Sequence, residues 1–270
     1  MSSQNDRVSI IIRTKARPTL LNRALLSIQS QDYSNIEVVI VEDGPAVSES
    51  IVNKYINDLH IVYLPVNQSV GRSKAANIGL EHATGKYINF LDDDDFFLPN
   101  HISTLHREIV SKPNVSVVHS ASIEKKVIYH SLEPLCMEVT NGQVRYNYPV
   151  HHERIFFENM FPIQAAMFKK ELYEQVGGID ESLEWLEDWD LWIKFSMISK
   201  FIFSNQVTSV YHIPGDKETN TNRSKVLKRY EKQISNKYLK YIELHNLKRP
   251  GILNKILRKF KWKVWNMFLV

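Results

Sequence analysis

Four short apolar runs, separated by segments of helical periodicity, constrain the fold of this chain more than any other feature of its sequence. The runs cover residues 8–12, 37–41, 61–64 and 87–91, and each has the length and composition of a buried strand. Because helical segments separate them, we expect parallel strands joined by crossover helices. The sequence therefore predicts an α/β fold with a mostly parallel, Rossmann-like sheet flanked by helices.

The helical segments are indicated by the spacing of their apolar residues. After Pro18, one helical face is formed by Leu20, Leu21, Ala24, Leu25 and Ile28. After a break at residues 43–45, a second face is expected from Ile51, Val52, Tyr55 and Ile56. A third helix is predicted over residues 73–82, so that each pair of successive strands is joined by one helix.

The remainder of the chain is less regular. Periodicity weakens over residues 123–161, where aromatic and His residues accumulate, and no element is predicted there. After Pro214 the chain becomes polar and basic, so we expect a boundary near Gly215, between a main domain of residues 1–215 and a largely helical extension of residues 216–270. Further predicted elements are strands at 116–120 and 165–168, a helix near 170–175 that stops at Gly177 and Gly178, and a helix over about 188–199.

Acidic residues follow two of the predicted strands. Asp43 follows the second, and Asp92, Asp93, Asp94 and Asp95 follow the fourth. The carboxyl ends of parallel strands meet at one edge of a sheet, where open α/β folds bind their ligands. In an extended backbone Asp92 and Asp94 point to one face and Asp93 to the other. Two carboxylates are therefore expected to converge at a ligand-binding edge.

Such crowding of like charges calls for a cation. Two charges about 5 Å apart repel by about 3 kcal/mol at an effective dielectric constant near 20. Ligand sets made only of oxygen select hard divalent ions such as Mg²⁺ or Mn²⁺, which share their coordination with substrate phosphates. A solvated acidic loop or a helix N-cap is the alternative. The preceding strand and the following Phe96, Phe97 and Leu98 favour a binding site.

These motifs, taken together and in order, resemble glycosyltransferase family 2, a large family of inverting enzymes with the GT-A fold and a D-x-D motif. The similarity spans about residues 8–212. Five blocks in the right order are far more specific than one short acidic motif. The similar blocks are residues 8–18, residues 39–44, residues 67–79, residues 85–95 with the D-x-D segment, and residues 177–192 on the acceptor side.

The resemblance implies a nucleotide-sugar donor, with a UDP-sugar favoured, and Mn²⁺ or Mg²⁺ as cofactor. It implies that Asp43 contacts the base, Asp92 the ribose, with Asp93 beside it, and Asp94 the metal. Thr14 and Arg17 would line the nucleotide pocket. The family commonly has an Arg where this chain has Ala76, before Asn77. Arg72 or Lys74 is expected to supply that charge, unless both are surface residues.

A second acidic site, at Glu187 and Asp188, provides candidates for the base that an inverting transfer needs. The resemblance favours Asp188, and Glu187 is the close competitor, because adjacent residues at a helix start point in different directions. Alternatively, these acids only complement a helix dipole. The resemblance also suggests His212, at a predicted strand end, as a further metal ligand, against a purely structural role.

Aromatic residues near this acidic pair have two interpretations. Trp185, Trp189 and Trp192 are either platforms that stack on sugars or ordinary core residues, and helical spacing favours the core for Trp192.

Residues 252–270 are predicted to form a basic amphipathic helix, with Lys and Arg mainly opposite an apolar arc. It would lie on an anionic membrane surface or pack on protein, including a sister subunit. No run is apolar and long enough to span a bilayer. Cys136 is the only cysteine, which excludes an intrachain disulfide and fits the cytoplasm, with peripheral attachment to the inner face of the membrane through this helix.

The predicted function is an inverting, metal-dependent transfer of sugar from a nucleoside-diphosphate sugar to a hydroxyl of a glycan or lipid-linked glycan. A non-catalytic nucleotide-sugar-binding module is the alternative from another class. A sugar nucleotidyltransferase is less favoured, because residues 13–18 stand where a Gly-rich phosphate loop would follow the first strand. No nucleic-acid-binding motif is present.

Overall fold

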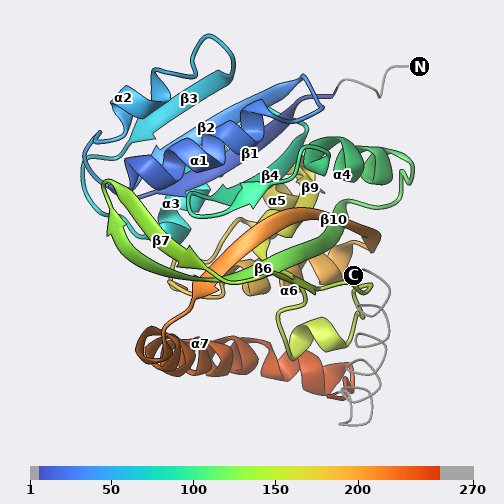
Figure 1. Ribbon diagram of the computed structural model, residues 1–270. Helices are drawn as coiled ribbons and strands as arrows, with labels where there is room; N and C mark the ends of the chain where they lie inside the picture. The colour runs from blue at the N-terminus through green and yellow to red at the C-terminus, as the bar shows by residue number, and fades with distance from the viewer. Residues whose placement is uncertain (1–5, 250–270) are drawn as a thin grey trace.

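Strand β1 (Val8–Thr14) lies between β2 (Ile36–Glu42) and β4 (Tyr87–Asp92) and runs parallel to both. Strand β3 (His60–Pro65) extends this parallel group beyond β2. The computed structural model, which describes residues 6–249, shows these strands as one half of a curved ten-stranded sheet (Figure 1). The four strands predicted from the apolar runs are confirmed.

The other half of the sheet is mixed in direction. Strand β9 is antiparallel to both β4 and β6, β10 is parallel to β6, and β5 is antiparallel to β10. The order is β3-β2-β1-β4-β9-β6-β10-β5, and β7 and β8 pair with β6 as well. These strands are β5 (Phe96–Phe97), β6 (Val117–Leu132), β7 (Leu135–Val139), β8 (Gln143–Arg145), β9 (Ala166–Lys169) and β10 (Phe201–Pro214).

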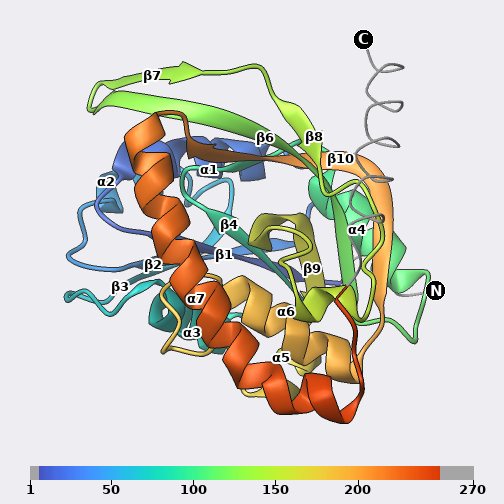
Figure 2. The ribbon, with the colours of Figure 1, turned by 90° about the horizontal axis from the view of Figure 1, so that it is seen from below.

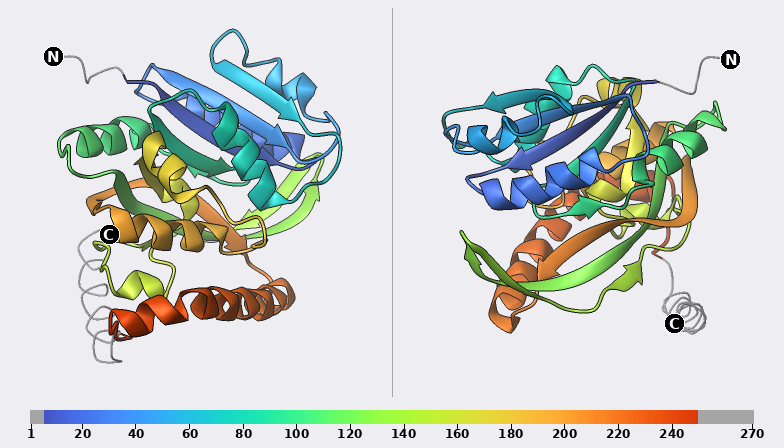
Figure 3. Two further views of the ribbon diagram at one scale, coloured as in Figure 1. Left: turned by 180° about the vertical axis from the view of Figure 1, so that it is seen from behind. Right: turned by 45° about the horizontal axis from the view of Figure 1, so that its top comes forward.

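Helices cover both faces of the sheet, as Figures 1 and 3 show. The predicted helices after Pro18, over residues 73–82, near 170–175 and over about 188–199 are confirmed. Gly177 ends α5 in the left-handed conformation (φ 73°) that favours glycine. The helices are α1 (Pro18–Gln29), α2 (Glu49–Val52), α3 (Arg72–His82), α4 (His101–Val110), α5 (Lys170–Val176), α6 (Glu187–Ile198), α7 (Lys217–Leu244) and the 3₁₀ turns η2 (Arg154–Phe156) and η3 (Ile163–Ala165).

Alternate residues of β1 serve two separate hydrophobic cores. Ile11 packs in one core with side chains from α3, α5, α6 and α7. Ile10 and Ile12 pack in the other with side chains from α1, α2 and α4. Successive strand residues point to opposite faces, so a strand that is apolar throughout requires helices on both sides. The continuous burial of β1 follows from this arrangement.

Two sequence expectations need correction. The helix expected to include Ile56 ends at Val52, and Ile56 is 55% exposed. Beyond Val52 the amide of Tyr55 bonds to the residue three positions earlier, and this tighter winding moves Ile56 off the buried face. The unassigned residues 123–161 contain the end of β6, all of β7 and β8, and η2. The end of β6 and the whole of β7 are mostly half-exposed or exposed, so their sequences lack the apolar run that marks a buried strand.

Helix α7 crosses the face of the molecule on which α5 and α6 lie (Figure 2). Its Ile234 and Tyr238 are 0% and 7% exposed and belong to the core beneath that face. This core therefore includes residues beyond Gly215, and the division of the chain into a domain of residues 1–215 and an extension of residues 216–270 stays a prediction. The helix expected over residues 252–270 lies outside the described residues. Within residues 6–249, no helix combines the length and the apolar character that a bilayer span requires.

Truncation of Ile234 tests whether α7 is part of this core. We expect Ile234→Ala to lower the free energy of unfolding by about 2–5 kcal/mol, because it leaves a cavity among fully buried neighbours. Leu239→Ala on the same helix is the matched control, since Leu239 is 50% exposed and its truncation should cost little. Urea unfolding measures both, and equal values for the two variants would show that α7 does not pack as described.

Candidate active site

A cleft of about 1210 Å³ opens at the carboxyl ends of β1, β2 and β4. The chain leaves β1 towards β2 and β3 on one side and returns to β4 on the other, so the cleft lies at a topological switch point of the sheet. Its walls also include the start of α3, the segment after β4, the start of α6, the end of β10 and the first turns of α7. Segments distant in sequence therefore meet at one site.

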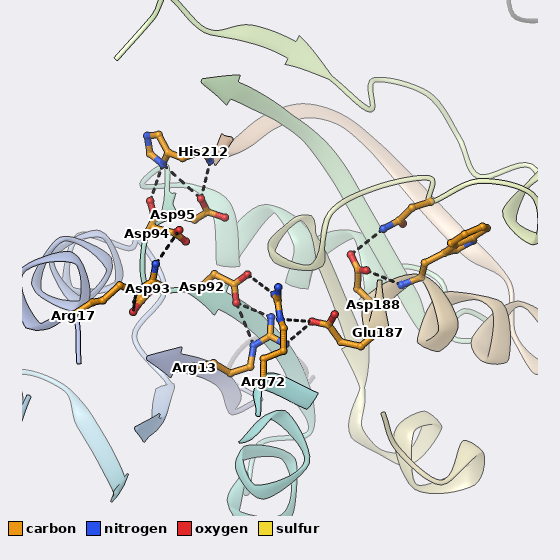
Figure 4. Close-up of polar contacts among 12 residues, drawn as sticks. Arg13, Arg17, Arg72, Asp92, Asp93, Asp94, Asp95, Glu187, Asp188 and His212 are labelled. Carbon is orange, nitrogen blue, oxygen red and sulfur yellow. Dashed lines mark hydrogen bonds and ion pairs between the residues drawn. The ribbon is translucent and has the colours of Figure 1, made fainter. Parts of the chain in front are cut away.

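Two arginines and two carboxylates form an ion-pair network at the base of the cleft (Figure 4). Arg13 contacts Asp92 Oδ1 through Nη2 at 2.6 Å and Glu187 Oε1 through Nη1 at 2.6 Å. Arg72 contacts Asp92 Oδ2 at 3.2 Å and Glu187 Oε1 at 3.0 Å. Each carboxylate is thus shared by both guanidinium groups.

The sheet itself brings Arg13 and Asp92 together, because they are register partners on the adjacent strands β1 and β4. The side chains of Arg13 and Glu187 are only 6% and 3% exposed, whereas that of Arg72 is 37% exposed. Burial alone would raise the pKa of Asp92, but the Arg13 and Arg72 guanidinium groups outweigh it and lower that pKa to about 2. Asp92 is therefore a permanent anion.

The next two aspartates point in different directions. Asp93 is fully buried and accepts hydrogen bonds from Thr14 Oγ1 at 2.7 Å and Arg17 Nε at 3.0 Å. Asp94 lines the cleft, and its Oδ2 lies 3.4 Å from Arg17 Nη1.

Asp92 and Asp94 thus line the cleft and Asp93 does not, as predicted. The predicted cause is wrong, because β4 ends at Asp92 and the next residues form a turn, closed by a hydrogen bond from the Asp95 amide to the Asp92 carbonyl, rather than an extended strand. Asp93 anchors the loop after β1 to the acidic segment.

His212, at the end of β10, lies against the same acidic segment. Its Nδ1 is 2.7 Å from the Asp94 carbonyl oxygen, and its backbone amide donates to Asp95 Oδ1 at 2.8 Å. A carbonyl only accepts, so Nδ1 carries the proton, and in the neutral ring Nε2 keeps a lone pair. Burial lowers the pKa of the imidazole, which favours this neutral form.

Asp94 and His212 fit a divalent ion that completes its coordination with phosphate oxygens. Among residues 6–249 no cluster of three or more His, Cys, Asp or Glu side chains could hold a metal by itself. Mg²⁺ and Mn²⁺ are commonly held by one or two protein ligands together with substrate phosphates and water. The donor set therefore suits a metal that is shared with a substrate rather than enclosed by protein.

Asp43 directly follows the last residue of β2 and lines the cleft there. Its Oδ1 accepts from the amides of Val70 and Gly71 at 2.5 and 3.3 Å, and its Oδ2 accepts from Ser69 Oγ at 3.0 Å. Lys15 lies 3.5 Å from the same carboxylate. Asp43 consequently holds the loop before α3 against the cleft wall.

Asp188 lies at the start of α6 with fewer partners than its neighbour Glu187. Its Oδ2 accepts from Asn159 Nδ2 at 3.0 Å and its Oδ1 from the Trp189 amide at 2.8 Å, and no salt bridge to it is found among residues 6–249. Burial raises its pKa to about 6, and the adjacent Glu187 carboxylate contributes to the rise. At neutral pH Asp188 is therefore an anion that can accept a proton.

Most of the predicted residues line the cleft. The prediction that Asp93 contacts the nucleotide is wrong, because its carboxylate is fully buried on Thr14 and Arg17 and is absent from the lining.

Lys74 does not line the cleft either. It is exposed on α3 and absent from the cleft lining, whereas Arg72, two residues earlier, lines it. Trp185 lines the cleft, while Trp189 and Trp192 are 2% and 0% exposed and belong to the core. The three tryptophans thus divide between the two interpretations that the sequence left open.

Several cleft residues carried no usable sequence signal. Asn159 and Tyr146 come from the stretch without periodicity, and Arg223 comes from α7, in the extension. Only Arg13, beside Thr14 in a block already recognised, had a signal that could have pointed to the site, because a charged residue at the end of an apolar strand is unusual.

The profile described as glycosyl transferase family 2 matches residues 9–177, which is more than half of the chain. The chain belongs to glycosyltransferase family 2. An uncharacterized glycosyltransferase of Rickettsia prowazekii is 28% identical over 227 residues, covering 79% of this chain and 66% of the relative. The chain thus spans just under two thirds of that relative's length.

Solved structures place this family 2 member among proteins of the GT-A fold. S. aureus TarS 1–349 in complex with UDP-GlcNAc superposes with a TM-score of 0.64 at 16% identity, covering 86% of this chain and 71% of that one. Mannosyltransferase PcManGT from Pyrobaculum calidifontis, in complex with GDP-Man and Mn²⁺, gives 0.59 at 23% identity, covering 79% and 59%. The predicted GT-A fold and family are confirmed.

Removal of Arg13 tests the ion-pair network of this family 2 member. Arg13→Met leaves two carboxylates without their buried partner, so we expect the free energy of unfolding to fall by about 3–5 kcal/mol. Lys74→Met removes an exposed charge outside the cleft and should change it by less than about 0.5 kcal/mol. Urea denaturation measures both, and a loss below about 1 kcal/mol for Arg13→Met would contradict the network.

Proposed function

We propose that this family 2 member is an inverting, metal-dependent glycosyltransferase. It moves a sugar from a nucleoside-diphosphate sugar, with UDP-sugars favoured, to a hydroxyl group of a glycan or lipid-linked glycan. The family membership and the nucleotide sugars bound by TarS and PcManGT support the donor class. The observation that carries the proposal is the different environment of two adjacent acids, Glu187 and Asp188.

Glu187 is unsuited to act as the base. Its side chain is 3% exposed and lies within 3.0 Å of both Arg13 and Arg72, so its carboxylate is already engaged in two ion pairs. Asp188 has only neutral hydrogen-bond donors on its carboxylate and a pKa of about 6. A general base is most effective when its pKa lies near the working pH. We therefore assign the base to Asp188 and a structural, charge-balancing role to Glu187.

We assign the nucleotide to the part of the cleft at the carboxyl ends of β1, β2 and β4. Asp43 and Thr14 lie beside the base and ribose positions, Asp92 faces the ribose and sugar, and Arg17 and Arg72 supply positive charge for the diphosphate. Asp94, with His212, would hold Mn²⁺ or Mg²⁺. When bound, the ion neutralises charge on the departing diphosphate.

The transfer is a single displacement. The acceptor oxygen forms a bond to the anomeric carbon from the face opposite the diphosphate, while the bond from that carbon to the phosphate oxygen breaks. Asp188 takes the proton of the acceptor hydroxyl, and the nucleoside diphosphate leaves with the bonding electron pair. Arg17 and Arg72 stabilise its added charge. Trp185 and Tyr146 also line the cleft, and we assign them to contacts with the acceptor sugar.

Two substitutions separate donor binding from transfer. Asp188→Asn should lower kcat by about 10²–10⁴-fold while binding of UDP with Mn²⁺ stays unchanged, because only the proton acceptor is lost. Asp94→Ala should weaken Mn²⁺-dependent binding of UDP as well as turnover. Nucleoside diphosphate release from a panel of UDP-sugars and GDP-mannose measures turnover, and calorimetry with UDP and Mn²⁺ measures binding.

Lys74→Met, outside the cleft, is the control for both substitutions. Tight binding of UDP with no release from any donor in the panel would favour a non-catalytic binding module. Pyrophosphate-dependent formation of a nucleoside triphosphate would favour a nucleotidyltransferase. Normal turnover in both variants would refute the assignment of the site.

The pKa of Asp188 predicts the pH dependence of turnover. A base is active when deprotonated, so a pKa of about 6 predicts that kcat falls tenfold per pH unit below pH 6 and levels off above it. A pH profile of kcat from pH 5 to 8 at saturating donor checks this. A kcat that stays constant down to pH 5 would exclude Asp188, as described, from the proton transfer.

A further inference from the structure

Helix α7 lies outside residues 9–177, the part of the chain that the family profile matches, yet it packs directly behind the proposed base. Figures 1 and 2 show it crossing beneath α6, whose first turn carries Asp188, and beneath the segment that contains η2. Two sets of contacts, which share Tyr238, join α7 to these two elements. Both sets hold residues that lie close in the chain to Asp188 or to Asn159, which donates a hydrogen bond to it.

The first set of contacts joins α7 to α6 through Asp190, two residues after the base. Asp190 is fully buried, and its Oδ1 accepts a hydrogen bond from Tyr238 Oη at 2.7 Å. Lys237 Nζ lies 2.7 Å from the same oxygen and 2.6 Å from Asp180 Oδ2, while Lys194 Nζ lies 3.2 Å from Asp190 Oδ2. A buried carboxylate requires such partners, so α7 fixes the position of the first turn of α6.

The second set joins α7 to η2 through aromatic rings. Phe156 stacks on Tyr241 with ring centroids 5.1 Å apart and meets Tyr238 edge-on at 6.2 Å. Trp189 of α6 donates its indole N–H to the Ile155 carbonyl at 2.5 Å, which ties η2 to α6 as well. Tyr238 therefore contacts both elements at once.

These two elements supply the surroundings of the proposed base. Asn159, three residues after Phe156, donates to Asp188 Oδ2 at 3.0 Å. It is the only side chain that donates a hydrogen bond to Asp188 among the described residues. The direction of the carboxylate is thus set by the relative position of α6 and the segment after η2. That position is held by the Trp189–Ile155 hydrogen bond and by the side chains of α7 that contact both elements.

We propose that α7 positions the catalytic base, with Tyr238 as the principal positioning residue and Lys237 supporting it. Tyr238 joins α6 and η2, so the docking of α7 helps to hold Asn159 within hydrogen-bond distance of Asp188. The proposal rests on the assignment of Asp188 as base. Tyr238 does not line the cleft and touches neither donor nor acceptor, so its action is indirect.

Tyr238→Phe is the sharpest test, because it removes only the hydroxyl that binds Asp190 and keeps the ring against Phe156. Tyr230→Phe is the matched control: Tyr230 lies on the same helix, and the structure shows no hydrogen bond from its hydroxyl to any described residue. We expect Tyr238→Phe to lower kcat about 10-fold to 100-fold, the scale of a small misplacement of a reacting group. The affinity for UDP with Mn²⁺ should stay within about twofold of the unsubstituted protein.

The pH profile supplies a readout that general destabilisation would not move. The titratable and charged groups around Asp188 are Glu187, Arg72 and Tyr146.

The hydrogen bond from Asn159 lowers the pKa of Asp188, as do the Trp189 amide and Arg72, because each stabilises the carboxylate. The Asn159 hydrogen bond is the one that depends on the segment after η2. Loosening that bond should raise the pKa, so the acid limb of the kcat profile should move to higher pH in Tyr238→Phe.

Asn159→Ala should move the acid limb in the same direction. The two substitutions combined should lower kcat by less than the product of their separate effects, because they act on one contact. Turnover is measured with the UDP-sugar or GDP-mannose released fastest in the donor panel, and Asp188→Asn is measured in the same series.

Loss of turnover in Asp188→Asn, together with a Tyr238→Phe variant that matches Tyr230→Phe in kcat and pH profile, would overturn the positioning role alone. Parallel loss of UDP affinity and kcat in Tyr238→Phe would also overturn it, since the substitution would then act on the whole fold. Full turnover in Asp188→Asn would instead remove the proposed function.

Discussion

The need to neutralise several carboxylates at one edge of a parallel sheet governs the rest of this structure. Asp92 to Asp95 follow β4, and Glu187 joins them from α6. Arg13 and Arg72 compensate Asp92 and Glu187, while Arg17 compensates Asp93 and approaches Asp94. The three arginines do not match all of these acids: Asp94 has one Arg contact, at 3.4 Å, and no salt bridge to Asp188 is found among the described residues. The carboxylates of Asp94 and Asp188 are therefore able to accept a further positive charge or a proton. Those two positions are the ones we assign to metal and proton.

The parallel half of the fold could be predicted from sequence because burial on both faces leaves an unmistakable pattern. Strands such as β1 and β4 are apolar throughout, and their polar ends are the site. Strand β6 could not be predicted to its full length, because it is buried continuously only up to Ser122, and beyond that residue only Val127 is buried. Helix α4 was missed as well, since its buried face contains His101, Thr104 and His106 among its apolar residues. These polar side chains conceal the helical period.

The division of roles between Glu187 and Asp188 could not be predicted from their spacing. Both are acids at a helix start, and they differ only in what the fold places beside them. Glu187 meets Arg13, which comes from β1, whereas Asp188 meets Asn159, which comes from a segment without periodicity. The partners in each contact are far apart in the chain, so no local pattern in the sequence reveals the contact. The same holds for Tyr238, whose contact with Asp190 depends on the path of α7 after β10.

The central claim is that the acids after β4 bind a nucleoside diphosphate together with a divalent ion, and a crystal structure with UDP and Mn²⁺ tests it most directly. The account predicts anomalous scattering from Mn²⁺ between the Asp94 carboxylate and the diphosphate oxygens, with the uracil near Asp43. Manganese bound elsewhere, or UDP bound outside the cleft with Asp94 directed into solvent, would contradict it.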